Sequence, residues 1–224
     1  MLKSMKTDFE RFEENLQGSL SQLGVSLNEG QVKQFYQYLH LYQKWSQKMN
    51  LSSIHDEKEI IIKHFADSLV GLSLLGGVKT IADVGTGAGF PGIPLKIIQP
   101  LLEVFLFESK EKKVFFLKQL TRTLRLKKTK VIHMSIGMDS QKELSSIFQD
   151  KRLDAVFFRA LKPDIEILES IRPYLSEKGR FYLYEGKNFD VESFNKELKP
   201  SFSVHIVKTV VLDQNLERKI LAIF

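Results

Sequence analysis

The sequence predicts an α/β fold, in which a mostly parallel sheet of seven strands follows an N-terminal helical region. Two observations predict it. Residues 5–75 show helical periodicity without a strand pattern, and from residue 80 short apolar runs alternate with amphipathic segments. Such alternation is typical of parallel βαβ units with helices on both faces of the sheet. We therefore expect a helical region over residues 1–75 that packs on an α/β domain over residues 76–224.

The N-terminal region is expected to contain two main helices. Asn28-Glu29-Gly30-Gln31 resembles a capping box, and an apolar, largely aromatic stripe at helical spacing follows it. The stripe consists of Phe35, Tyr38, Leu39, Tyr42, Trp45 and Met49. A stripe of this period packs in a core more often than it stacks bases, so we interpret it as core. The second helix is predicted over 57–75, with Ile61, Phe65, Leu69 and Leu72 on one face.

The strands are expected at the seven apolar runs 81–84, 104–107, 130–133, 154–158, 180–184, 204–211 and 220–224. Helices are expected near 93–99, 112–126, 140–149, 163–175 and 189–198. Residues 212–218, between the last two runs, are too few for a crossover helix, so these strands should pair as an antiparallel hairpin. A Rossmann-like seven-stranded sheet with its last strand antiparallel is the layout of class I S-adenosylmethionine-dependent methyltransferases.

Composition narrows the function classes. The 224-residue chain has a formal net charge of +6, which favours a polyanionic partner such as nucleic acid and leaves a basic, solvated surface as the alternative. The absence of cysteine excludes disulfides, thiolate metal sites and a cysteine nucleophile. The five histidines are too dispersed for a local metal motif, so no metal is expected. The start lacks a signal-peptide pattern and no apolar span has membrane length, so we expect a cytoplasmic protein without a membrane partner.

The stretch DVGTGAGFPG, residues 83–92, directly follows the first predicted strand. Glycine lets a backbone adopt positive φ and approach a ligand closely, and the first strand-to-helix turn of an open parallel sheet is the usual cradle. Gly87–Gly92 matches the G-x-G-x-x-G pattern of dinucleotide folds, which alone is a weak signal. The register differs from that pattern, because the glycine that follows the strand is Gly85.

Two acidic residues indicate the ligand of this loop. Asp83 at the strand end would repel a pyrophosphate and suits the cationic S-adenosylmethionine. Glu108 ends the second predicted strand, where its carboxylate can accept hydrogen bonds from both ribose hydroxyls of a nucleoside. Glu108 serves NAD and S-adenosylmethionine equally, so Asp83 and the loop register favour S-adenosylmethionine as the cofactor.

With these features, the chain resembles the bacterial 16S ribosomal RNA guanine-N7 methyltransferases, the glucose-inhibited division protein B family. The resemblance runs from about residue 20 to the end, and the pairing of "HFADSL" with "GFPGIP" is its most specific part. The matching stretches are Trp45 with Asn50-Leu51-Ser52-Ser53-Ile54, His64 to Leu69, Asp83 to Pro94, Glu108-Ser109, Lys112 to Leu117, and Arg159-Ala160.

The resemblance implies roles for particular residues. Gly85 and Phe90 would line the methyl donor, Ile136 and Gly137 would contact the adenine, and Arg159 would lie at the mouth of the active site as the catalytic residue. The alternatives are that Phe90 is plain core and that Arg159 is a surface ion-pair partner. The complete set of predicted cofactor-binding residues is Asp83, Gly85, Gly87, Gly89, Phe90, Glu108, Ile136, Gly137 and Arg159.

The resemblance also implies the reaction, methylation of guanine N7 in 16S ribosomal RNA, with the loop around nucleotide 527 as the family target. The expected partner is this RNA or the small ribosomal subunit. The protein itself is expected to be a monomer. The N7 lone pair needs no general base, so catalysis would come mostly from orientation. A nicotinamide dehydrogenase is disfavoured.

Three positions depart from the family pattern: Ser135, Gly137 and Glu185, with Lys187 as a candidate substitute for a missing lysine. They motivate an alternative, a non-catalytic RNA-binding or ribosome-assembly factor with the same fold.

Two further groups of residues have competing interpretations. His64, Asp67 and Ser68 invite a hydrolase interpretation, but they fall within two turns of one predicted helix, so a hydrogen-bonded cluster next to the glycine loop is favoured. The basic segment 110–130 pairs an apolar face with charges that meet either solvent or RNA phosphates. Its basic residues are Lys112, Lys113, Lys118, Arg122, Arg125, Lys127, Lys128 and Lys130.

Overall fold

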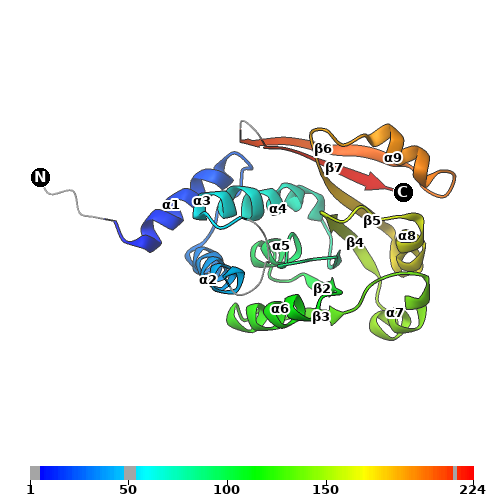
Figure 1. Cartoon of the computed structure of the whole chain (residues 1–224), viewed down its shortest axis with the longest axis horizontal. Coiled ribbons are helices and arrows are strands. Elements are labelled where there is room, and N and C mark those ends of the chain that lie inside the picture. The colour runs from blue at the N-terminus through cyan, green and yellow to red at the C-terminus, as the bar shows by residue number, and fades with distance from the viewer. Residues whose placement is uncertain (1–5, 48–53, 214–215) are drawn as a thin grey trace, which may run out of the picture.

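The structure, a computed structural model, describes residues 6–47, 54–213 and 216–224. Its N-terminal part is helical and lies beside the sheet (Figure 1). This part consists of α1 (Asp8–Ser21), α2 (Glu29–Ser46), α3 (Glu57–Ile60), the π-helical η1 (Ile61–Ala66), α4 (Asp67–Leu69) and the 3₁₀-helical η2 (Val70–Leu75).

The remainder is an α/β sheet with helices on both faces. Its strands are β1 (Thr80–Val84), β2 (Glu103–Glu108), β3 (Thr129–His133), β4 (Leu153–Arg159), β5 (Leu175–Gly186), β6 (Val204–Asp213) and β7 (Leu216–Ile223). The connecting helices are α5 (Gly92–Ile98), α6 (Glu111–Thr123), α7 (Gln141–Phe148), α8 (Ile165–Ile171) and α9 (Val191–Leu198), with short 3₁₀ turns η3 (Met138–Ser140) and η4 (Arg172–Tyr174).

The sheet has seven strands in the order β3-β2-β1-β4-β5-β7-β6. β1 to β5 pair in parallel, whereas β7 runs antiparallel to both β5 and β6. The predicted seven-stranded sheet with a reversed last strand is therefore confirmed. The strand order changes direction between β1 and β4, and this is where a ligand site is expected in such sheets.

Two apolar cores lie on opposite faces of the sheet. Ile81 and Leu106 pack with α2, α5 and α6, and Ala82 and Phe107 pack with α7, α8 and α9. Figure 1 shows α7 to α9 on the opposite side of the sheet from the N-terminal helices. Alternate residues of each parallel strand thus enter different cores, which explains why the strands read as continuous apolar runs.

The N-terminal helices pack as their aromatic stripe predicts. Asn28 and Gln31 form the predicted capping box at the start of α2. Phe35, Tyr38 and Tyr42 are completely buried in the same core as strands of the sheet. Because this core is continuous, the division into separate units over 1–75 and 76–224 stays a prediction. Met49 and Asn50–Ser53 lie outside the described residues.

The predicted single helix over 57–75 is interrupted. It begins as α3, widens into the π-helical turn η1, returns to α4 and ends in η2. Asp67 and Ser68, both fully buried, lie directly after the π turn. Tertiary contacts of these polar side chains override the apolar periodicity, and single π turns of this kind are frequent at functional sites.

Tyr184 of β5 ties this interrupted helix to the sheet. Its buried hydroxyl accepts a hydrogen bond from the Gly71 N–H at 3.1 Å and donates to the Ser68 carbonyl at 2.9 Å. Tyr184→Phe removes both of these buried hydrogen bonds, so we expect the free energy of unfolding to fall by about 1–3 kcal/mol in urea denaturation. The control is Tyr182→Phe, whose hydroxyl makes no hydrogen bond within the described residues. Equal losses in the two variants would contradict this account.

Candidate active site

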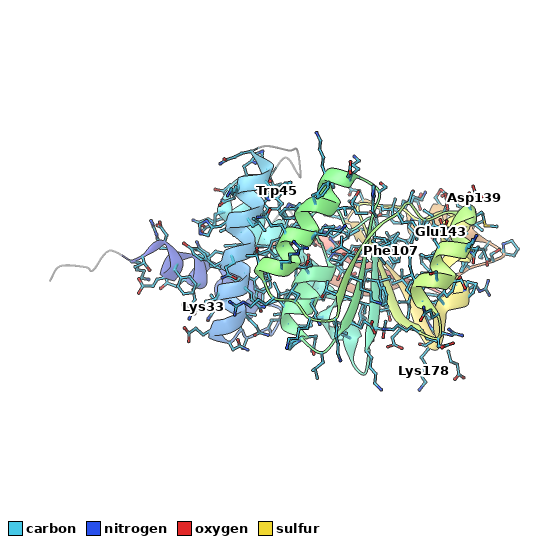
Figure 2. All side chains as sticks on the ribbon, turned by 90° about the horizontal axis from the view of Figure 1, so that it is seen from below. Lys33, Trp45, Phe107, Asp139, Glu143 and Lys178 are labelled. Carbon is cyan, nitrogen blue, oxygen red and sulfur yellow. The ribbon has the colours of Figure 1, made fainter. Side chains whose placement is uncertain are left out.

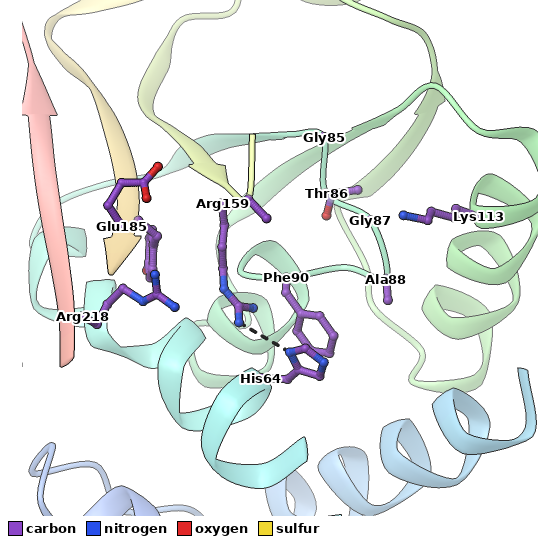
Figure 3. A pocket seen from close by; sticks show the side chains of 12 residues that line it. His64, Gly85, Thr86, Gly87, Ala88, Phe90, Lys113, Arg159, Glu185 and Arg218 are labelled. Carbon is purple, nitrogen blue, oxygen red and sulfur yellow. Dashed lines mark hydrogen bonds between the residues drawn. The ribbon is translucent and has the colours of Figure 1, made fainter. Parts of the chain in front are cut away.

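A cavity of about 390 Å³ opens at the carboxyl ends of β1, β4 and β5 (Figure 3). This volume lies within the range of small-molecule sites. The lining residues are His64, Gly85, Thr86, Gly87, Ala88, Phe90, Lys113, Arg159, Ala160, Tyr184, Glu185 and Arg218. The N-terminal helices, the glycine loop, α6 and three further strands therefore all contribute to one site.

The glycine loop forms one wall because its backbone takes conformations that favour glycine. Gly85 and Gly87 have φ values of +70° and +63°. The N–H groups of Gly85 and Thr86 both donate to the Phe107 carbonyl at 3.0 Å, which fixes the loop on the end of β2. A methyl group on Gly85 would lie 2.8 Å from Cδ2 of Leu161, whereas one on Gly87 would lie 3.8 Å from Lys113 Nζ and 3.9 Å from the Gly85 carbonyl oxygen, in ordinary contact. The loop thus presents bare backbone to the cavity.

Asp83 holds this loop from behind. Its Oδ2 accepts hydrogen bonds from Thr86 Oγ1 at 2.6 Å and from the Gly92 N–H at 2.7 Å, and Oδ1 has no hydrogen-bond partner among the described residues. Complete burial raises the pKa of the Asp83 carboxyl to about 6. Asp83 does not line the cavity, so direct contact between its carboxylate and a cationic ligand stays a prediction.

Glu108 supports the loop from the end of β2. Its Oε2 accepts the Gly87 N–H at 2.9 Å and its Oε1 accepts the Lys110 N–H at 2.8 Å. Each carboxylate oxygen retains acceptor capacity beyond these bonds, because an ionised carboxylate offers about four acceptor sites. Glu108 can therefore hold the loop and still accept hydrogen bonds from ribose hydroxyls.

A buried charge cluster forms the opposite wall. Asp67 of α4 is completely buried and pairs with two arginines that line the cavity. Its Oδ1 accepts a hydrogen bond from Arg218 Nε at 2.6 Å and its Oδ2 accepts one from Arg218 Nη2 at 3.0 Å. Oδ2 also forms an ion pair with Arg159 Nη2 at 2.7 Å. One carboxylate thus fixes two guanidinium groups from β4 and β7. The two guanidinium groups and Asp67 together carry one net positive charge, and Glu185, which also lines the cavity, offsets it.

An aromatic stack joins the two walls. The His64 ring stacks on Phe90 with centroids 4.6 Å apart, and the Arg159 guanidinium lies 5.6 Å from the Phe90 centroid (Figure 3). Burial, and then the Arg159 charge, lowers the pKa of His64 to about 3, so its ring is neutral at physiological pH. Ser68 Oγ donates to the His64 carbonyl at 2.6 Å, not to its ring. The three residues thus lack the contacts of a hydrolase triad, as expected from their spacing.

The structure brings only some of the predicted site residues to the cavity. Gly85, Gly87, Phe90 and Arg159 line it. The others lie behind or beside it: Asp83, Gly89, Glu108, Ile136 and Gly137.

The residues beside the cavity have local roles that the structure shows. A methyl group on Gly89 would lie 2.6 Å from Cγ1 of Ile93, so Gly89 is a packing glycine. Ile136 packs in the same apolar core as the buried residues of α7, and the Gly137 N–H donates to Ser140 Oγ at 3.0 Å. Contact between these residues and the cofactor stays a prediction.

Eight lining residues were not among the predicted site residues: His64, Thr86, Ala88, Lys113, Ala160, Tyr184, Glu185 and Arg218. Glu185 stood out in the sequence only as a departure from the family pattern. Lys187, the candidate substitute for a missing lysine, is exposed and does not line the cavity. Lys113, Arg159 and Arg218 supply the positive charge instead. Arg218 and Tyr184 come from strands far along the chain, and no local motif marks them.

Neither a metal-binding cluster nor a membrane-spanning helix occurs in the part of the chain that the structure describes. Among residues 6–47, 54–213 and 216–224, no group of three or more His, Cys, Asp or Glu side chains could hold a metal ion. None of the described helices is long and apolar enough to cross a membrane.

Solved structures define the class of fold. A putative caffeoyl-CoA O-methyltransferase from Staphylococcus aureus matches with a TM-score of 0.55 and 16% identity, covering 83% of this chain and 91% of that one. An rRNA methylase from Streptococcus thermophilus matches with a TM-score of 0.50 and 16% identity, covering 72% of this chain and 95% of that one. The fold is that of the class I S-adenosylmethionine-dependent methyltransferases, as predicted.

Sequence relatives define the family. The GidB family, rRNA small subunit methyltransferase G, matches residues 31–221. The ribosomal RNA small subunit methyltransferase G of Caldanaerobacter subterraneus is 39% identical over 76% of this chain and 70% of its own length. The protein of the same name from Desulfitobacterium hafniense is 38% identical over 76% and 69%. The chain belongs to the rRNA small subunit methyltransferase G family, which confirms the resemblance and S-adenosylmethionine as the cofactor.

Proposed function

We propose that this protein transfers a methyl group from S-adenosylmethionine to guanine N7 in the 16S RNA of the small ribosomal subunit. The observation that carries the proposal is that the glycine loop lines the same cavity as Arg159 and Arg218. The Glu108 carboxylate holds this loop by accepting a hydrogen bond from the Gly87 N–H. Family membership supports the RNA substrate. The loop around nucleotide 527 is the target that the family resemblance favours.

The residues at the loop fit the methyl donor. Gly85 and Gly87 both line the cavity with their backbone, and Glu108 has acceptor capacity for a ribose. Lys113 of α6 reaches over Gly87, where a positive charge suits the donor's carboxylate. When bound, S-adenosylmethionine supplies an activated methyl group. The chain's own part is to hold the nucleoside end on the glycine loop and leave the rest of the cavity to the target base.

The target base would enter on the arginine wall. Guanine N7 carries its lone pair in the plane of the ring and needs no proton removed before it attacks, so a neutral His64 is no obstacle to the reaction. Arg159 is held by Asp67 and lies over Phe90, where it can contact the base or its phosphate. Catalysis then comes from orientation of the two reactants, an effect that is large when both are held rigidly.

The basic face of α6 is proposed as an RNA contact. Val114, Leu117 and Leu120 are buried against the body of the protein, so the lysines and arginine between them face outward. α6 lies beside α2, and Figure 2 shows side chains projecting outward from both helices. Trp45 at the end of α2 donates its Nε1–H to Gln119 of α6 at 3.0 Å, which fixes the two helices together.

Charge removal on this face gives a measurable prediction. The triple variant Lys112→Gln, Lys118→Gln, Arg122→Gln should bind small-subunit RNA more weakly. The slope of log affinity against log salt concentration should fall by roughly 0.7–0.9 for each phosphate that the variant no longer neutralises. The matched control replaces Lys142, Lys178 and Lys196, which are exposed on other elements. An unchanged slope in the α6 variant would show that these charges meet only solvent.

The second candidate function is a non-catalytic RNA-binding factor, and Glu185 in the cavity is the observation that favours it, since an acid can repel RNA phosphate. Incubation with labelled S-adenosylmethionine and excess small subunits decides between the two. The proposed enzyme transfers many methyl groups per protein molecule, whereas the binding factor transfers none. We propose a monomer, working in the cytoplasm where its ribosomal substrate is made.

A further inference from the structure

Glu185 is an acid in a cavity otherwise dominated by positive charge. It ends the part of β5 that borders the site, and its side chain is half-buried at the cavity wall (Figure 3). Within the described residues it forms no ion pair, because Arg218 is committed to Asp67. Glu185 therefore retains acceptor capacity toward the cavity.

The sheet places Glu185 across the cavity from the glycine loop. β1, which carries the loop, is separated from β5 by β4 alone. Two strand spacings put the ends of β1 and β5 about 10 Å apart. Arg159 at the end of β4 lies between them, over the aromatic stack of Phe90 and His64. A planar base held between the loop and β5 would have one edge toward the cofactor and a second edge toward Glu185.

Guanine has the matching chemistry on its two edges. N7 lies on the Hoogsteen edge, and the N1–H and the N2 amino group, both donors, lie on the adjacent Watson–Crick edge. A carboxylate is an acceptor with two oxygens, so it can receive both donors side by side. Adenine has an acceptor at N1 and would be repelled by the same carboxylate. Enzymes that act on a base commonly recognise it through hydrogen bonds to this Watson–Crick edge.

We propose that Glu185 selects guanine by accepting hydrogen bonds from N1–H and the N2 amino group, which turns N7 toward the cofactor loop. This inference rests on the proposed function and names the residue that sets its base specificity. Burial raises the pKa of the Glu185 carboxyl, and the charges of Arg218 and Lys162 oppose this effect by favouring its ionised form. The ionised Glu185 carboxylate at the cavity wall is stabilised by strong hydrogen-bond donors, and guanine provides two of them.

The test compares guanosine with inosine, which keeps N7 and N1–H and lacks the N2 amino group. Two RNAs that differ only in this nucleotide at the methylated position are assembled into small subunits, and kcat/KM is measured for each. The wild-type protein should prefer guanosine about 10- to 100-fold, because inosine cannot form one of the two charge-assisted hydrogen bonds. Glu185→Ala should methylate the two RNAs at rates within about threefold of each other, since no acceptor remains to distinguish them.

Controls separate the ways in which this inference can fail. Glu177→Ala removes an exposed acid from the other end of β5 and should keep the full guanosine preference. Glu185→Gln keeps the side-chain shape with one acceptor and should show an intermediate preference, which guards against misfolding of the alanine variant. An undiminished preference in Glu185→Ala, or a weaker affinity for S-adenosylmethionine in place of a diminished preference, overturns the role. Failure of the wild-type protein to methylate either RNA overturns the proposed function itself.

Discussion

Replacing Asp67 by asparagine is expected to lower the free energy of unfolding by about 3–5 kcal/mol, the cost of leaving a buried ion pair without one partner. Asp67 is completely buried, and the side chains of Arg159 and Arg218 are only 12% and 15% exposed. For a chain of this size, such a loss corresponds to a melting temperature lower by roughly 6–20 °C. Methyl transfer should also fall, because Arg159 loses its ion pair and is held over Phe90 only by the Lys63 carbonyl and the His64 ring.

The control for Asp67→Asn is Glu59→Gln, which breaks an exposed pair with Lys63 on the neighbouring turn. That change should cost no more than about 0.5–1 kcal/mol, as is usual for surface pairs. Thermal unfolding of the two variants and the wild-type protein makes the comparison. If Asp67→Asn were as stable as Glu59→Gln, the charge cluster would not hold the site together.

Gly85→Ala is expected to abolish detectable binding of S-adenosylmethionine. The residue has φ of +70°, which costs an alanine about 1–2 kcal/mol. The new methyl group would also lie 2.8 Å from Cδ2 of Leu161, so either the loop or Leu161 must move. Displacement of the loop would break the hydrogen bonds of its backbone N–H groups to the Phe107 carbonyl and to the Glu108 carboxylate. Calorimetric titration with S-adenosylmethionine measures the loss.

Gly76→Ala is the matched control for Gly85→Ala. Gly76 has φ of −59°, and a methyl group there would meet no atom within 4 Å. This variant should bind the cofactor with wild-type affinity. Unchanged binding in Gly85→Ala would show that the glycine loop does not form the cofactor site, and the assignment of the cavity would have to be abandoned.

The sheet could be predicted from the sequence because its strands have a simple physical signature. Strands buried on both faces read as short apolar runs, and the hairpin of β6 and β7 followed from a connection too short for a helix. The loop Gly85–Gly92 was also recognisable, because positive φ and close backbone approach require glycine. These features depend only on residues that are close together in the sequence, so a local sequence pattern is enough to predict them.

The rest of the site depends on contacts that no local pattern encodes. Arg218 reaches Asp67 across most of the length of the chain, and Tyr184 binds the turn at Ser68 in the same way. The interruption of the predicted helix over 57–75 has this cause as well. Asp83 illustrates a subtler limit: its position suggested a ligand contact, whereas its hydrogen bonds are to Thr86 and Gly92 of its own loop.

The most direct test of the central claim is the identity of the methylated nucleoside. Small subunits that lack the modification are incubated with the protein and methyl-labelled S-adenosylmethionine, and the RNA is digested to nucleosides for mass spectrometry. The account predicts label in 7-methylguanosine, at a level that exceeds the amount of protein present. Label in another nucleoside, or no label while an active member of the family succeeds in parallel, would contradict it.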